Sequence, residues 1–202
     1  MLIASVDLTP DLPRAVSLAL SAIPRGGAVV QLREKAMGAG DLLTLARKLR
    51  SICVPQGAPL LLNERCDVAL AADLDGVHLP AHALSARDAR ALLGPDALIG
   101  ASCHSQDEVA RALRDGADLA VYGPVFDTPG KGPAQGLAAL SQAAHDTALP
   151  LFALGGIDAS NAESALLAGA RGVACQRAVL GAPDPAAAAR ALWASLALAG
   201  PL

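Results

Sequence analysis

The segment Pro150–Ala174, PLFALGGIDASNAESALLAGARGVA, holds one complete unit of the fold. It opens with the apolar run Pro150–Leu154, and an unbroken run of this kind is typical of a parallel strand buried on both faces. Asp158 to Asn161 then begin an Ala-rich helical segment, and Gly169-Ala170 leads into a second short strand at Gly172–Ala174. The segment therefore predicts a strand, a helix and a second strand in succession.

The same alternation runs along the whole chain of 202 residues and occurs eight times. The expected strands are Leu2–Val6, Ala28–Leu32, Pro59–Leu62, Gly76–Leu79, Leu98–Ser102, Leu119–Gly123, Pro150–Leu154 and Gly172–Ala174. Eight β/α units in a chain of this length predict an α/β fold, a single (β/α)8 TIM barrel occupying residues 1–202 as one domain. An open, doubly wound sheet is the alternative, and the count of eight favours closure.

Several residues are placed to cap the helices of these units. Asp11 and Ser105 precede helical segments and are N-cap candidates, and Glu108 has capping-box spacing from Ser105. Gly94 and Gly116 stand where C-terminal glycines are expected.

Composition excludes several functional classes. The chain has 16 Lys and Arg against 19 Asp and Glu, a net charge of −3, so a nucleic-acid-binding surface is not expected. No apolar run reaches the roughly 18 residues of a membrane span. The four cysteines form no C-x-x-C pair and no signal segment is evident, which predicts a reduced, cytoplasmic protein. A homo-oligomer is considered, but nothing in the sequence specifies its symmetry.

The run QLREK at the end of the second strand carries two cations. Alternation along a strand places Gln31, Arg33 and Lys35 on one face, toward the barrel mouth. Cationic side chains are rarely buried without a partner, so this arrangement predicts an anionic ligand. The alternative is a structural ion pair of Arg33 with Glu34 or Glu64.

Polar groups also end the next three strands. Asn63 and His78 close two of them, and Ser102-Cys103-His104 closes the third. Ser102 and His104 share a face while Cys103 faces the other way, which argues against a Cys-His nucleophile. His104 is the best general acid/base candidate because imidazole titrates near neutral pH. A capping or loop histidine is the alternative.

A Gly/Pro-rich loop, Gly123–Gly132, follows the sixth strand and is too long for a plain connection. Long loops in this position are often lids, so Thr128 and Lys131 are expected to contact an anion when the loop closes. The alternative is a mobile surface loop with no role in ligand binding.

The seventh and eighth strands end in Gly155-Gly156 and in Cys175-Gln176-Arg177. Loops after these two strands form the recurrent phosphate site of TIM barrels, because their N–H groups converge on the ligand. Arg177 is expected to add a charged contact to the phosphate.

Together these strings resemble the thiamine-phosphate synthase/TenI family, from about Ile3 to Leu180. The strings are VVQLREK, LLLNERCDVALAADLDGVHL, IGASCHSQDEVARALRDGADLAVYGPVFDTPGKG and LFALGGIDASNAESALLAGARGVA. In the synthase branch, the resemblance implies coupling of a pyrimidine diphosphate to a thiazole phosphate, with Mg2+ neutralising the departing diphosphate. It places Gln31, Arg33, Lys35, Asn63, Thr128 and Lys131 on the diphosphate, and Gly156 with the Gln176 and Arg177 backbone on the thiazole phosphate.

The sequence departs from the synthase pattern where the metal is expected. The family's Asn-Asp is Asn63-Glu64 here, and a second metal-binding Asp is replaced by Ala83. Mg2+ is held by oxygen ligands, so Glu64 is the remaining metal-ligand candidate, and Mg2+ is expected only if the chain is a synthase. Arg177 stands where the family usually has a small Ser, a change that the sequence does not explain.

The Leu-Pro that follows His78 resembles the TenI branch, which includes thiazole tautomerases that need a phosphate site and a base but no metal. The preferred hypothesis is therefore a TenI-like tautomerase with His104 as acid and base, and with Ser102 and Lys131 as further catalytic residues. The alternatives are a Mg2+-dependent thiamine-phosphate synthase and a non-catalytic regulatory binder of thiamine precursors.

Overall fold

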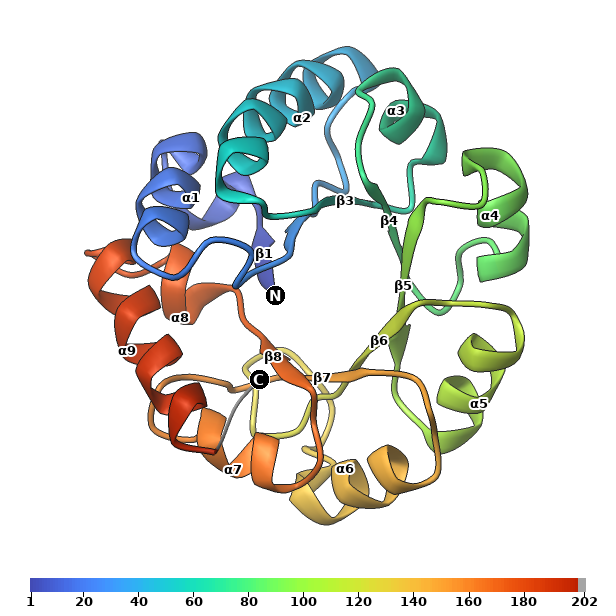
Figure 1. The fold of residues 1–202 in the computed structure, drawn as a ribbon, viewed down its shortest axis with the longest axis vertical. Helices are drawn as coiled ribbons and strands as arrows, with labels where there is room; N and C mark the ends of the chain where they lie inside the picture. The colour runs from blue at the N-terminus through green and yellow to red at the C-terminus, as the bar shows by residue number, and fades with distance from the viewer. Residues whose placement is uncertain (200–202) are drawn as a thin grey trace.

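The protein is a barrel of eight parallel strands enclosed by helices, as described by a computed structural model for residues 1–199 (Figure 1). The strands follow one another around the sheet in chain order, each hydrogen-bonded to the next. They are β1 Leu2–Ala4, β2 Val30–Leu32, β3 Leu60–Asn63, β4 Gly76–Leu79, β5 Leu98–Cys103, β6 Leu119–Tyr122, β7 Leu151–Leu154 and β8 Gly172–Ala174.

The barrel closes between its first and last strands. Leu2 and Cys175 form an isolated parallel bridge. The Ile3 N–H donates to the Cys175 carbonyl at 2.8 Å, and the Cys175 N–H donates to the Met1 carbonyl at 3.0 Å. The predicted (β/α)8 barrel is confirmed, and the open doubly wound sheet is excluded.

Helices form the outer layer around the strands (Figure 1). They are α1 Leu12–Ser21, α2 Ala39–Cys53, α3 Cys66–Ala71, α4 Ala86–Leu93, α5 Gln106–Arg114, α6 Gly136–His145, α7 Ala162–Leu167, α8 Arg177–Leu180 and α9 Pro185–Leu198, with 3-10 turns at Val6–Leu8 and Val54–Gln56. Within residues 1–199, none of the helices has the length and apolarity needed to cross a membrane.

All eight predicted strands exist, and the differences are at their ends. The first was predicted to reach Val6, but it ends at Ala4 because residues 6–8 form a 3-10 turn capped by Ser5. The predicted N-caps are also present, with Asp11 accepting from the Arg14 N–H at 3.2 Å and Ser105 from the Glu108 N–H. The capping box is displaced by one residue, because the Glu108 carboxylate accepts from the N–H of His104 rather than of Ser105.

Side-chain alternation along the strands produces two apolar layers. Residues facing outward pack against the helices in the main core. A smaller cluster fills the barrel interior and comprises Met1, Ile3, Leu61, Leu119, Val121 and Ala174. Phe152 packs against this cluster. Its ring fits because Gly172 has no side chain: a Cβ at this position would lie 2.8 Å from the ring. The barrel is therefore a packed core whose ligand-binding surface lies at one end.

Gly76 lies where two strands approach closely, and Gly40, in a helix, serves as its control. A Cβ at Gly76 would lie 1.8 Å from the Leu98 carbonyl oxygen, whereas one at Gly40, in α2, would meet nothing within 4 Å. We expect Gly76→Ala to lower the free energy of unfolding by more than about 2 kcal/mol. Gly40→Ala should raise it by roughly 0.5–1 kcal/mol. Urea unfolding followed by circular dichroism measures both, and equal midpoints for the two variants would contradict the close approach at Gly76.

Candidate functional site

The carboxyl ends of the parallel strands bring the predicted polar residues to one rim. Gln31 on β2 and Asn63 on β3 are 2% and 4% exposed. The Gln31 Nε2 donates to the Asn63 Oδ1 at 3.1 Å, so each amide holds the other in place. A buried amide pair of this kind is rigid and leaves the remaining amide atoms available to a ligand.

His78 on β4 forms a second buried polar pair, with Ser102 on β5. The His78 Nε2 lies 2.9 Å from the Ser102 Oγ. The His78 Nδ1 has no hydrogen-bond partner in the described part of the chain and lies over Gly100, whose absent Cβ would be 2.6 Å away. Burial, reinforced by the positive charge of Arg33, lowers the pKa of His78 to about 4, so the ring is neutral at pH 7. Sequence analysis placed His78 at the rim but assigned it no role.

Within residues 1–199, the rim cations have no acidic partner. Arg33 is half-buried and Lys35 is exposed, and neither forms an ion pair with a residue in 1–199. The proposed structural pair does not form, because the Glu34 carboxylate accepts from the Val6 N–H at 2.5 Å and Glu64 faces His82. Lys131 and Arg177 likewise lack an ion pair among the described residues. Four positive charges at this end of the barrel therefore form no ion pair with the part of the chain that the structure describes.

His104, directly after β5, is oriented by the backbone of the next strand. Its Nδ1 lies 2.6 Å from the Gly123 carbonyl oxygen. A carbonyl oxygen only accepts, so Nδ1 carries a proton and donates it in this hydrogen bond. Cys103 is buried on the opposite face, and burial raises the pKa of its thiol to about 12, which agrees with the argument against a Cys-His nucleophile.

Residues 123–135, between β6 and α6, form the long loop, and its first part lies on the end of β7. The Val125 N–H donates to the Leu154 carbonyl at 2.8 Å, and the Phe126 N–H donates to the Gly155 carbonyl at 3.0 Å. The Thr128 Oγ1 donates to the Phe126 carbonyl. Lys131 is exposed near the loop tip. The base of the loop is thus fixed, while the cation that it carries faces solvent.

Gln135 holds the far end of this loop, and sequence analysis missed it. Its Oε1 accepts from the Tyr122 hydroxyl at 2.5 Å, and its Nε2 donates to the Gly123 carbonyl at 3.1 Å. The same carbonyl accepts from His104, so the loop and the imidazole share one acceptor. No local sequence pattern predicts this contact, because it depends on the Gly/Pro-rich loop folding back on β6, the strand that precedes it.

Gly155 and Gly156 have φ angles of 102° and 63°, in the left-handed region that favours glycine. Added Cβ atoms would lie 2.6 Å from Pro124 and 2.7 Å from the Asp127 carbonyl, so both glycines are also needed for packing of the long loop. The N–H groups of Gly156, Gln176 and Arg177 donate to no described residue. Loops after two adjacent strands therefore present free backbone donors, as a phosphate site requires.

The expected metal position holds one carboxylate. Glu64 follows β3 and is 39% exposed at its side chain, and its Oε2 lies 3.7 Å from the His82 Nε2. Ala83, the position of the family's second acidic residue, has no ligand atom. Residues 1–199 contain no group of three His, Cys, Asp or Glu side chains that could hold a metal ion. An all-oxygen Mg2+ site made by two carboxylates therefore does not exist here.

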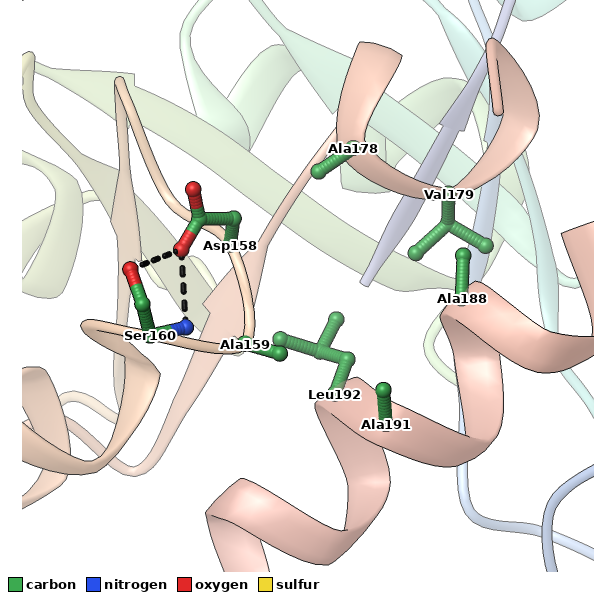
Figure 2. Close-up of a pocket in the computed structure, with 8 residues that line it drawn as sticks. All are labelled: Asp158, Ala159, Ser160, Ala178, Val179, Ala188, Ala191 and Leu192. Atoms are coloured by element: carbon green, nitrogen blue, oxygen red, sulfur yellow. Dashed lines mark hydrogen bonds between the residues drawn. The ribbon is translucent and has the colours of Figure 1, made fainter. Parts of the chain in front are cut away.

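A separate cavity of about 360 Å³ lies between the loop after β7, α8 and α9 (Figure 2). Asp158, Ser160, Ala178, Val179 and Leu192 are among its lining residues. Hydrogen bonds from Ser160 lower the pKa of Asp158, so its carboxylate is charged and disfavours an anion. The cavity contains none of the predicted site residues.

Comparison with known proteins identifies a family and several relatives that this chain resembles. The family described as thiamine monophosphate synthase matches residues 2–179. A thiamine-phosphate synthase of Roseiflexus sp. strain RS-1 is 43% identical, over 92% of this chain and 80% of its own. One from Methanoculleus marisnigri is 44% identical, over 90% and 88%. The solved thiamine phosphate pyrophosphorylase of Pyrococcus furiosus is 31% identical with a TM-score of 0.88, over 96% and 93%.

The buried neutral His78 predicts a loss of stability in acid. Its folded pKa of about 4 lies below the ordinary 6.5, so the unfolded chain binds the proton more readily between these values. Stability should therefore fall as pH drops from about 6.5 to about 4, by about 1.4 kcal/mol per pH unit from this group. Urea unfolding of wild type and His78→Gln across this range isolates the contribution. Identical pH slopes for the two proteins would rule it out.

Proposed function

The chain belongs to the thiamine monophosphate synthase family, and from this premise we propose that it joins a pyrimidine diphosphate to a thiazole phosphate. The relatives that it matches carry the synthase name, which supports this reaction over the TenI-like tautomerase preferred from the sequence alone. The branch is thus assigned by overall similarity rather than by the altered metal position.

The uncompensated charge at the rim is the observation that carries the proposal. Arg33, Lys35 and Lys131 reach the rim from β2 and from the long loop without an acidic partner in residues 1–199. A diphosphate carries at least two negative charges, so three cations suit it as a ligand. Guanidinium and ammonium groups bind its oxygens through charge-assisted hydrogen bonds. Thiazole tautomerisation has no need for these three cations.

Polar groups beside the cations complete the diphosphate half of the site. The hydrogen-bonded amides of Gln31 and Asn63 are fixed at the ends of β2 and β3, and Thr128 lies at the base of the loop that carries Lys131. We assign these residues to the diphosphate. Ser102, which is hydrogen-bonded to the buried His78 ring, is assigned to the pyrimidine ring that bears the diphosphate.

The thiazole phosphate is assigned to the opposite half of the rim. The N–H groups of Gly156, Gln176 and Arg177, in the loops after β7 and β8, donate to no described residue, and we assign them to this phosphate together with the exposed Arg177 side chain. Gly155 contributes by the left-handed turn that opens this backbone. Backbone donors suit a phosphate because their positions are set by the barrel.

In the coupling reaction, the bond from the pyrimidine methylene carbon to the diphosphate oxygen breaks and a carbon–nitrogen bond to the thiazole forms. The diphosphate leaves with the electron pair, so positive charge near its oxygens stabilises the transition state. Arg33 and Lys35 supply part of this charge from the barrel, and Lys131 supplies more when the long loop closes. Mg2+, when bound, would add to this neutralisation, with Glu64 as the one carboxylate in position to hold it.

A thiazole tautomerase is the second candidate, and His104 is the observation that favours it. Its Nδ1–H is held by the Gly123 carbonyl while Nε2 is available to take and return a proton. Such a reaction needs the phosphate half of the rim and no metal. It would therefore tolerate the replacement of the family's acidic residue by Ala83.

An assay with each thiazole tautomer, with and without the pyrimidine diphosphate and Mg2+, separates the candidates. We expect diphosphate release that requires both substrates, and the comparison with and without Mg2+ measures how far the reaction depends on a metal ion. Lys131→Ala should lower kcat roughly 10²-fold, because it removes one charge from the departing group. Lys48→Ala, on the outer helix α2, is the matched control and should leave kcat unchanged. Tautomer interconversion without diphosphate release would establish the tautomerase, and substrate binding without either reaction would favour a regulatory binder.

Arg177 gives a separate test of the phosphate half. We expect Arg177→Ser to raise the KM for the thiazole phosphate about tenfold, since a charge-assisted hydrogen bond is lost while the backbone donors remain. The KM for the pyrimidine diphosphate should not change. Steady-state kinetics with each substrate varied in turn measures both constants, and an unchanged thiazole KM would remove Arg177 from the site.

A further inference from the structure

His78 is a buried imidazole that has no assigned part in the proposed reaction. Its side chain is 2% exposed. In the register of the sheet, His78 on β4 pairs with Gly100 on β5, and Gly100 pairs with Leu119 on β6. A Cβ at Gly100 would lie 2.6 Å from the His78 Nδ1 and 3.0 Å from the Leu119 Cδ1. The His78 ring therefore fits in this position because β5 has no side chain at Gly100.

The two ring nitrogens of His78 lie beside two residues on the same face of β5. Side chains two residues apart on a strand share a face, so Ser102 follows Gly100 on this face, closer to the rim. The His78 Nε2 lies 2.9 Å from the Ser102 Oγ. Nδ1 lies beside Gly100 and has no hydrogen-bond partner in residues 1–199. Only Nε2 therefore has a polar group to bond.

The unpartnered Nδ1 indicates which nitrogen of His78 carries the proton. A buried N–H without an acceptor is rarer in folded proteins than an acceptor that is left unused. A proton on Nδ1 would be such an N–H, because no described residue accepts from it. The arrangement therefore favours a proton on Nε2, where it is donated to the Ser102 Oγ.

We propose that His78 is a positioning residue that directs the hydroxyl hydrogen of Ser102 toward the bound pyrimidine, so that Ser102 donates to a ring nitrogen. This inference rests on the proposed function, in which Ser102 contacts that ring. A hydroxyl has one hydrogen to donate and can accept at its oxygen. The half-buried Ser102 accepts from Nε2–H and makes no other side-chain hydrogen bond within the described chain, so its hydrogen is left for the ligand.

The direction of this hydrogen bond gives the site a preference among ring systems. A pyrimidine nitrogen accepts a hydrogen bond, whereas a C–H group in the same position of a pyridine ring does not. A pyridine in that place would leave the Ser102 hydroxyl hydrogen without a partner, which costs binding free energy in a partly buried site. His78 would thus contribute to substrate specificity through Ser102.

The proton position on His78 can be measured by NMR on the purified protein without substrate. In 15N-labelled protein, spectra that correlate ring carbon-bound hydrogens with ring nitrogens distinguish a protonated nitrogen from a bare one. We expect a protonated Nε2 for His78, and a protonated Nδ1 for His104, which donates to the Gly123 carbonyl. Substitution of His82, His104 and His145 one at a time assigns the His78 signals by elimination. A proton on the His78 Nδ1 would overturn the proposal.

Steady-state kinetics tests whether His78 acts on the pyrimidine. His78→Leu keeps a side chain of similar size and removes the hydrogen bond to Ser102. We expect it to raise the KM for the pyrimidine diphosphate about tenfold and to change kcat less than about threefold, because the bond to the ring is made before and during reaction. The KM for the thiazole phosphate should not change. His78→Gln, whose amide can donate from the position of Nε2, should recover most of the loss.

Two further comparisons show whether the effect passes through Ser102. Ser102→Ala should raise the KM for the pyrimidine diphosphate about tenfold, and the double variant with His78→Leu should be no worse. Ser51→Ala, on the outer helix α2, is the matched control and should leave both KM values unchanged. One of the two pyridine analogues that lack a ring nitrogen should bind wild type about tenfold more weakly than the pyrimidine and should bind Ser102→Ala no more weakly.

The outcomes separate this proposal from the synthase reaction. Additive effects of the two substitutions, or equal affinity of wild type for the pyrimidine diphosphate and for both pyridine analogues, would overturn the role of His78. The NMR measurement and the analogue series need no variant of His78, so they decide the question even where His78→Leu does not fold. A His78 protonated at Nε2, with Ser102-dependent pyrimidine binding but no release of diphosphate, would uphold the directed hydroxyl and reject the synthase reaction.

Discussion

Closure of the sheet between β1 and β8 is the constraint on which the site depends. Once the backbone of Ile3 and Cys175 joins the two edges, every strand runs parallel around one barrel and every carboxyl end faces the same rim. The two ends of the barrel differ in how their cations are paired. Arg90, at the other end of the barrel, donates hydrogen bonds to Asp118 and to three backbone carbonyls. At the carboxyl rim, Arg33 and Lys131 have no such partners among the described residues, so that end remains able to bind anions.

Patterns confined to one segment were sufficient to predict the barrel and the placement of its polar residues. Continuous apolar runs identified all eight strands, and alternation in QLREK placed Gln31 inside, because both signals depend only on local periodicity. Contacts made across the fold were not predictable in this way. The neutral state of His78 depends on burial by other strands, and the role of Gln135 depends on how residues 123–135 fold back. The Arg33 pairing considered from sequence proximity is absent because Glu34 serves the Val6 backbone.

The two halves of the rim, which we propose to hold two different anions, present different kinds of donor. After β7 and β8 the donors are backbone N–H groups, whose positions follow from the strand register and from the left-handed turns of Gly155 and Gly156. After β2 and in the long loop the donors are charged side chains, which move freely and respond to salt. In the proposed reaction, the first half would place one small phosphate precisely. The second half would follow the diphosphate as it departs.

One acceptor, the Gly123 carbonyl, receives both the Nδ1–H of His104 and the Nε2–H of Gln135. A carbonyl oxygen shared by two donors is a weaker partner for each than it would be for one alone. Gln135 ends the long loop and His104 follows β5, so this single oxygen connects the loop to the imidazole. The anchoring of the loop and the orientation of the imidazole therefore depend on one backbone carbonyl, so a substitution that shifted Gly123 would displace both together.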